Sequence, residues 1–134
     1  MATRRKDKYR SEKITLSYDP ASTAASAANI LYTVPAGRRL RITRVMYNNP
    51  TGLAGNVSNF YVIQILNAAL QAFSWSTSTA GQSTLTANTP VEFVKNATDA
   101  NAVLPAGTSL SYSAVLTGAA TLPAGRVVIE ADLI

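Results

Sequence analysis

The strongest constraint on the fold of this chain is a succession of short alternating runs with no long helical period between them. Runs rich in β-branched and aromatic residues recur, and clusters of Gly, Pro, Asn and Ser separate them. Short strands with turn signals between them are typical of a sandwich or a barrel. The sequence therefore predicts an all-β fold, an antiparallel β-sandwich of jelly-roll type, behind an extended basic N-terminal arm. The predicted strands of the sandwich cover residues 30–34, 39–47, 60–66, 70–75, 91–94, 109–116 and 126–134.

One turn sequence, Val/Leu-Pro-Ala-Gly, occurs at residues 34–37, 104–107 and 122–125, and an alternating run follows each copy. Proline fixes φ near the start of a turn, and glycine accepts a positive φ near its exit. We therefore expect each copy to be a turn that leads into a strand. Because the copies are unequally spaced, they do not predict a solenoid.

The inward-facing apolar side chains of these strands form the predicted core. In residues 39–47 the alternation shifts phase near Thr43 and Arg44, which predicts a β-bulge. The predicted core consists of Ile42, Val45, Phe60, Val62, Ile65, Phe73, Val91, Phe93, Leu110, Tyr112, Leu116, Val127 and Ile129.

Positive charge is concentrated at the N-terminus. The chain carries 12 basic and 7 acidic residues, for a net charge of +5. Residues 1–13 alone hold six basic and two acidic residues, a net of +4. A segment so charged and so poor in apolar residues does not fold by itself. We therefore divide the chain into residues 1–29, an extended arm with one short strand and an Ala/Ser/Thr-rich connector, and residues 30–134, the β-sandwich domain.

The arm supplies the candidate partner-binding residues. Its basic side chains suit either an acidic protein surface or the phosphates of a nucleic acid, on which Tyr9 would stack a base. A second basic group in the sandwich predicts a small basic ridge. The arm residues are Arg4, Arg5, Lys6, Lys8, Tyr9, Arg10 and Lys13, and the ridge residues are Arg38, Arg39, Arg41 and Arg44.

The residue types needed for most catalysis are missing. The chain contains no histidine and no cysteine, which removes Ser-His and Cys-His nucleophile pairs and ordinary zinc sites. A calcium site from Asn96, Asp99 and Asn101 is conceivable, but these are ordinary loop residues. No apolar run approaches the ~20 residues of a membrane helix. We therefore expect no enzyme, no cofactor, no metal and no membrane contact.

The low charge points instead to packing. Charged residues make up 14% of the chain, against roughly 25% in typical soluble domains. A surface built largely from hydroxyl and amide side chains favours a protein that packs against something.

A basic arm, an Ala/Ser/Thr connector and a β-domain punctuated by Pro-Ala-Gly turns, without His or Cys, resemble small virion proteins. The pattern is most similar to the capsid decoration or cement proteins of tailed bacteriophages, over about residues 30–134. The resemblance implies a protein on the capsid surface of a virion, a homo-oligomer with a trimer favoured, whose partner is the major capsid protein. It implies no cofactor and no active site.

Two alternatives stay open. One is a small capsid or nucleic-acid-binding protein whose arm faces the genome. The other is a fibre-tip or glycan-binding module that stacks sugars on Trp75 or Tyr47.

Overall fold

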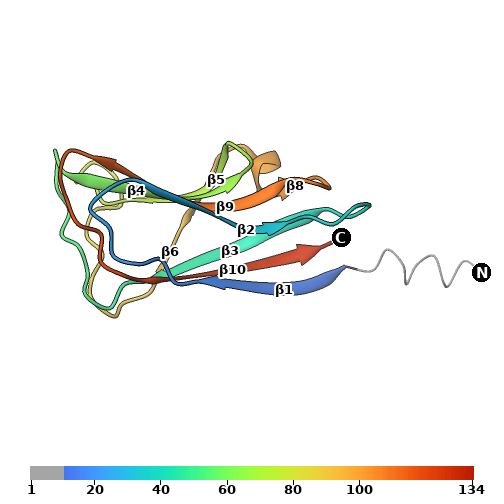
Figure 1. The fold of residues 1–134 in the computed structure, drawn as a ribbon, viewed down its shortest axis with the longest axis horizontal. Coiled ribbons are helices and arrows are strands. Elements are labelled where there is room, and N and C mark those ends of the chain that lie inside the picture. The colour runs from blue at the N-terminus through green and yellow to red at the C-terminus, as the bar shows by residue number, and fades with distance from the viewer. Residues whose placement is uncertain (1–10) are drawn as a thin grey trace, which may run out of the picture.

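The computed structural model describes residues 11–134, which form two antiparallel sheets packed face to face (Figure 1). The first sheet has the order β1 (Glu12–Tyr18), β10 (Arg126–Leu133), β3 (Leu40–Asn48) and β6 (Val91–Glu92), and β8 (Val103–Leu104) also pairs with β3. The second has the order β2 (Ala27–Thr33), β9 (Ser109–Thr117), β4 (Phe60–Asn67), β5 (Leu70–Ser76) and β7 (Val94–Lys95). A short 3₁₀ turn, η1 (Asp99–Ala102), precedes β8.

The strand pairing is nested. The first long strand pairs with the last, β2 pairs with β9, β3 pairs with β6 and β8, and β4 pairs with β5. Such pairing is that of one long antiparallel hairpin rolled over on itself, which is a jelly roll. The prediction of an all-β, jelly-roll-like sandwich is confirmed.

The sandwich begins earlier than residue 30, where the sequence placed its boundary. Strand β1 pairs along its whole length with β10, from Glu12 opposite Leu133 to Tyr18 opposite Val127. Its alternate side chains Ile14, Leu16 and Tyr18 are half-buried against the core. A strand with one apolar face is therefore part of the first sheet, although the basic arm and the connector flank it.

Most of the predicted core is buried. Fully buried positions from the prediction are Ile42, Val45, Ile65, Phe73, Phe93, Leu110, Tyr112, Val127 and Ile129. Val91 and Leu116 are partly buried and pack against this core, whereas the prediction is wrong for Phe60 and Val62, which lie outside it and remain partly exposed. In β4 the buried residues are instead Tyr61, Ile63 and Ile65. Almost every residue of β4 is apolar, so the alternation that reveals the inward face in other strands is missing there.

The predicted bulge in β3 is confirmed. Ile42 pairs with Ala131 and Arg44 pairs with Glu130, which leaves Thr43 as the extra residue. The Thr43 hydroxyl donates a hydrogen bond to the carbonyl of Glu130 (3.0 Å) and so satisfies a group that the bulge removes from the ladder.

Two copies of the Pro-Ala-Gly turn lie side by side at one end of the sandwich. The Val34 amide donates to the carbonyl of Thr108 (3.0 Å), and the Gly107 amide donates to the carbonyl of Val34 (2.8 Å). Gly37 and Gly107 both have positive φ, +74° and +80°. The third copy differs, because Gly125 does not have a positive φ and the hydrogen bond to the proline carbonyl that closes the first two turns is absent at Pro123. At Gly125 the ring and hydroxyl of Tyr47 instead occupy the space a side chain would need. The expectation of one turn used three times is thus wrong for the third copy.

The predicted strand over residues 91–94 changes sheets. Val91 and Glu92 pair with β3, whereas Val94 and Lys95 pair with β5. Between them Phe93 is buried, and its amide donates to the carbonyl of Val45 (2.9 Å). One short apolar run therefore joins the two sheets along this side of the sandwich.

Candidate interaction surfaces

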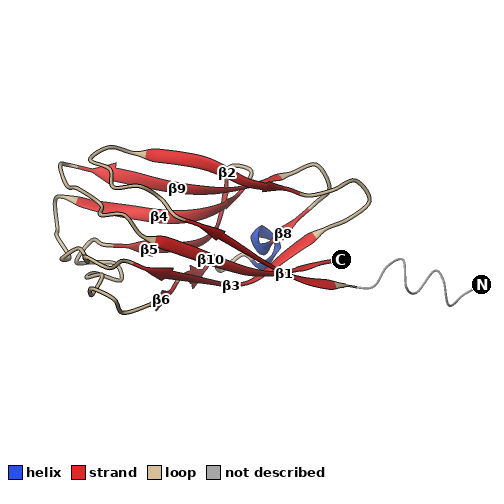
Figure 2. Cartoon of the chain, turned by 60° about the horizontal axis from the view of Figure 1, so that its bottom comes forward, coloured by secondary structure: helices blue, strands red, loops and turns tan. Residues whose placement is uncertain are grey.

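The outer face of the first sheet is charged and internally paired. Lys13 on β1 contacts Asp132 on β10 (3.5 Å), and Arg44 on β3 contacts Glu92 (3.6 Å) and Glu130 (3.9 Å). Exposed ion pairs of this kind contribute little to stability, but they keep a sheet face soluble. This face, which Figure 2 turns toward the viewer, has the composition of a solvated surface.

The outer face of the second sheet is different, because none of its four long strands contains a charged residue. In this sheet Lys95 of β7 lies opposite the inward-facing Phe73 and reaches Asp99 (3.0 Å), away from the outer face. We call this surface the charge-free face. Its outward side chains, from the strand register, are Ala28, Ile30, Val62, Gln64, Leu66, Ser74, Val94, Ser111, Ser113 and Val115.

Exposed apolar side chains gather on the strands of this sheet. Within residues 11–134, five large apolar side chains are exposed: Ile30, Val57, Leu70, Val94 and Val115. All except Val57 belong to β2, β5, β7 or β9. Depletion of charge together with exposed apolar groups is typical of a surface that another molecule covers.

The arm joins the sandwich at the end that holds the C-terminus. Glu12, the first residue of β1, pairs with Leu133. Arg38 contacts the Glu12 carboxylate (3.4 Å) and donates to the carbonyl of Leu133 (3.2 Å). Of the predicted arm residues, Arg4, Arg5, Lys6, Lys8, Tyr9 and Arg10 lie outside the described residues. Lys13 lies on β1 with its side chain 91% exposed.

Two of the four arginines of the predicted ridge contact acidic side chains, and the other two are placed by backbone pairing. Arg39 exchanges backbone hydrogen bonds with Ile134, and Arg41 pairs in register with Asp132. Arg38 and Arg44 contact the carboxylates of Glu12, Glu92 and Glu130. The structure thus places the arginines along one strand and its approach, but on a surface of mixed sign.

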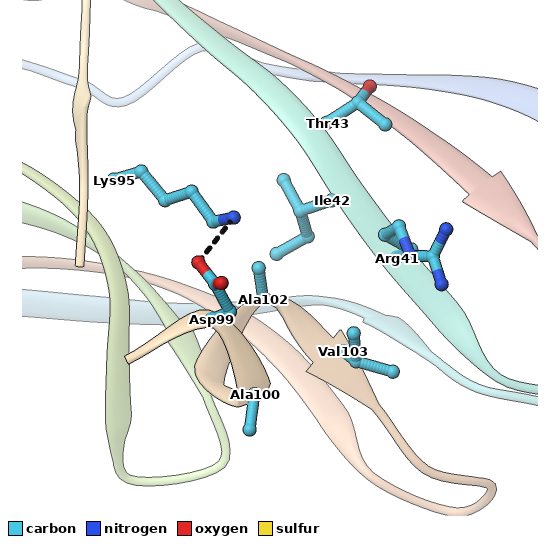
Figure 3. A pocket seen from close by; sticks show the side chains of 8 residues that line it. All are labelled: Arg41, Ile42, Thr43, Lys95, Asp99, Ala100, Ala102 and Val103. Carbon is cyan, nitrogen blue, oxygen red and sulfur yellow. Dashed lines mark hydrogen bonds and ion pairs between the residues drawn. The ribbon is translucent and has the colours of Figure 1, made fainter. Parts of the chain in front are cut away.

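A hollow lies between β3 and η1 (Figure 3). It has a volume of about 460 Å³, and it is lined by Arg41, Ile42, Thr43, Lys95, Asp99, Ala100, Ala102 and Val103. The Asp99 carboxylate accepts a hydrogen bond from Lys95 (3.0 Å). Asn96 accepts the Thr98 amide, and Asn101 donates to the carbonyl of Gln71, so the residues considered for calcium have structural roles in this loop. No group of three His, Cys, Asp or Glu side chains suited to a metal occurs within residues 11–134.

The two aromatic residues considered for sugar stacking are held by the core. Tyr47 is 1% exposed, and burial raises the pKa of its hydroxyl above the ordinary value. Trp75 is half-buried and packs against the core cluster. Tyr47 therefore offers no exposed ring for a sugar, and the core already covers part of Trp75.

The connector between β1 and β2 is tied to the last strand by an ion pair. The Arg126 guanidinium donates to both carboxylate oxygens of Asp19 (2.7 and 3.1 Å). These hydrogen bonds hold the pKa of Asp19 below its ordinary value. A carboxylate whose pKa is lowered by folding stabilises the fold above its unfolded pKa and loses that contribution as the pH falls through the folded value.

We therefore expect a pH-dependent effect of Asp19→Asn. At pH 7 the variant melts at a slightly lower temperature than the parent chain, because the bidentate pair is lost. Near pH 2 the two melting temperatures converge, because the parent carboxylate is protonated as well. Thermal unfolding at both pH values checks this, and a gap that persists at pH 2 would contradict it.

Comparison with known proteins gives no match: no protein family, no curated protein and no solved structure is similar to this chain at a significant level. In the part of the chain that the structure describes, no helix is long and apolar enough to span a membrane.

Proposed function

We propose that this chain is a non-enzymatic structural protein of a virion, a capsid decoration or cement protein that binds and stabilises the assembled shell of major capsid protein. The charge-free face is the observation that carries the proposal. One outer sheet face is built for solvent, with its charges paired, while the other lacks charge and exposes Ile30, Val94 and Val115. A sandwich with such unequal faces is suited to lying on another surface.

The size of the charge-free face explains why an arm would be useful. Four long strands about 4.8 Å apart and about 25 Å long present roughly 500 Å². Specific interfaces bury at least about 600 Å² on each partner. The face alone falls somewhat short, so we assign the remaining contact to the basic arm, which would lie along an acidic part of the shell.

The jelly-roll order is compatible with this role. Viral capsid proteins and lectins both use this fold, and a fold does not decide a function. The glycan-binding alternative has less support, since Tyr47 is buried and Trp75 packs against the core. A genome-facing role would depend on the arm, since Arg38, Arg44 and Arg126 already contact carboxylates.

The test uses capsid shells that lack this protein. Purified chain added to such shells should sediment with them and raise the temperature at which they disassemble. A variant without residues 1–11 should bind at least about tenfold more weakly, because the arm contacts are lost. Failure of the intact chain to sediment with shells would overturn the proposal.

A parallel measurement addresses the genome-facing alternative. If the arm serves nucleic acid, affinity for DNA or RNA will fall steeply with salt and disappear when residues 1–11 are removed, while binding to empty shells will be absent. The cement role instead predicts binding to shells that contain no nucleic acid.

A further inference from the structure

Strand β2 presents an unprotected edge. It ends the second sheet and pairs only with β9, so its other side faces no strand within residues 11–134. Ala27, Ala28, Asn29 and Ile30 are all exposed, and Ile30 is 64% exposed. No charged residue and no proline stands in β2. An edge of this kind offers free backbone donors and acceptors to another strand.

The other sheet edges in the described part of the chain are protected by familiar means. Strands β6, β7 and β8 have two residues each, too short to template a partner. Strand β1 carries Glu12 and the highly exposed Lys13 on its edge. Charged side chains and short strands are the devices by which proteins prevent edge pairing. Their absence from β2 alone marks it as an edge that is used.

We infer that the β2 edge is the seam between two copies of this chain, which pair antiparallel through β2 about a two-fold axis. The distribution of charge along the chain allows a second copy to bind at the β2 edge. The chain is net positive, so two copies repel each other where their basic residues meet. No charged residue stands between Asp19 and Arg38, so a β2–β2 seam brings only neutral segments together. The inference goes beyond the proposed function, because it concerns the protein without any shell.

Symmetry and side-chain size favour a particular register. Two identical strands related by a two-fold axis must pair antiparallel if they are to continue one sheet. The outer faces of the two copies then lie on the same side only when the axis passes through a residue, so that each residue lies opposite one of the same orientation. A bulge beyond Ile30 leaves Ala27–Ile30 as the regular part of the edge. Centred on Asn29, the seam would set Ile30 of one copy over Ala28 of the other, a large side chain against a small one. The two charge-free faces would then form one continuous surface.

The absence of cysteine makes a direct test clean. Asn29→Cys in the full chain should form a disulfide-linked dimer under mild oxidation, because this residue faces itself across the axis. Ala28→Cys and Ile30→Cys should each cross-link poorly alone, but a mixture of the two should form the mixed disulfide, because these positions lie opposite each other in this register. Leu70→Cys is the matched control, since it is exposed on the same sheet but away from the β2 edge. Equal cross-linking at all four positions would overturn the inference.

Charge placed in the seam gives an independent readout. In sedimentation velocity, Ile30→Lys should weaken the dimer about tenfold, because lysine on a strand edge opposes edge pairing and the two added charges would repel each other across the seam. Its monomer should keep the parent melting temperature, since Ile30 is exposed. Three results would overturn the two-fold seam. The intact chain could prove to be a monomer, it could prove to be a trimer, or it could form a dimer that dissociates only when residues 1–11 are removed. Because shells are absent, these results are separate from those of the decoration test.

Discussion

Replacing Asn49 by alanine is expected to lower the melting temperature of this protein by about 10 °C, an effect of about 3 kcal/mol on the free energy of unfolding. Asn49 is 1% exposed and lies where β3 ends at the loop end of the sandwich. Its amide nitrogen donates to the carbonyl of Pro123 (2.9 Å) and to the hydroxyl of Tyr47 (3.2 Å). Its amide oxygen accepts the backbone amides of Thr51 (3.1 Å) and Gly52 (2.8 Å).

The magnitude follows from the groups that would be left without partners. Alanine can replace none of these hydrogen bonds, so two backbone amides and one backbone carbonyl lose a partner in partly buried surroundings. A buried polar group without a partner costs about 1–3 kcal/mol. Some of this cost is recovered where water reaches the loops, which is why we expect about 3 kcal/mol.

The matched control is Asn29→Ala, the same truncation at an exposed strand position with no side-chain hydrogen bond to residues 11–134. At protein concentrations where the chain is monomeric, this control should shift the melting temperature by less than about 2 °C. Chemical denaturation of both variants, analysed with a common slope, gives the free energies. Similar losses in both variants would show that Asn49 has no special role.

The sequence predicts the turn that contains Asn49 but not the role of Asn49 itself. Asn48 and Asn49 are adjacent and chemically identical, and a turn cluster over residues 48–52 is readable from composition. Which amide points inward depends on where β3 stops pairing, and β10 sets that point, with Arg126 opposite Asn48. Long-range register of this kind leaves no local signal.

The same limit explains the correct and incorrect parts of the core prediction. In β3 and β10, polar and apolar residues alternate, so Val45, Val127 and Ile129 are assigned correctly, and even the bulge at Thr43 is visible. In β4 both faces are apolar, so Phe60 and Val62 are assigned inward in error.

The apolar outward side of β4 is itself informative once the sheet order is known. Val62 lies opposite Val115 of β9, and Gln64 lies opposite Ser113, across the middle of the charge-free face. The apolar outward side chains of β4, which hide the alternation in its sequence, therefore belong to the surface that we propose to bind the shell. The sequence shows a low overall charge, but only the strand order shows that the charge-free strands lie together in one sheet.

Introducing one lysine into that face should strongly weaken shell binding. We expect Val115→Lys to weaken the binding of the chain to capsid shells by about 100-fold, because the interface would have to bury an ammonium group without a partner. Val115 is 42% exposed on β9, so the substitution leaves the core intact and the melting temperature close to that of the parent. Quantitative sedimentation with shells, at fixed salt, measures the change.

The jelly roll supplies an unusually close control for this experiment. Val128 lies on β10, which is second from the edge of the first sheet just as β9 is second from the edge of the second sheet. Val128→Lys therefore makes the same substitution at the corresponding place on the opposite outer face, opposite Ser17 and Met46 and two residues from Arg126 and Glu130 on the same strand. It should bind shells as the parent does.

Two other outcomes would contradict the proposal. If Val128→Lys loses binding and Val115→Lys keeps it, the shell contacts the charged face, because only a lysine at the contact disturbs binding. If both variants lose binding equally, added positive charge opposes binding wherever it is placed. That result would argue against an acidic surface on the shell and against the arm as a basic tether.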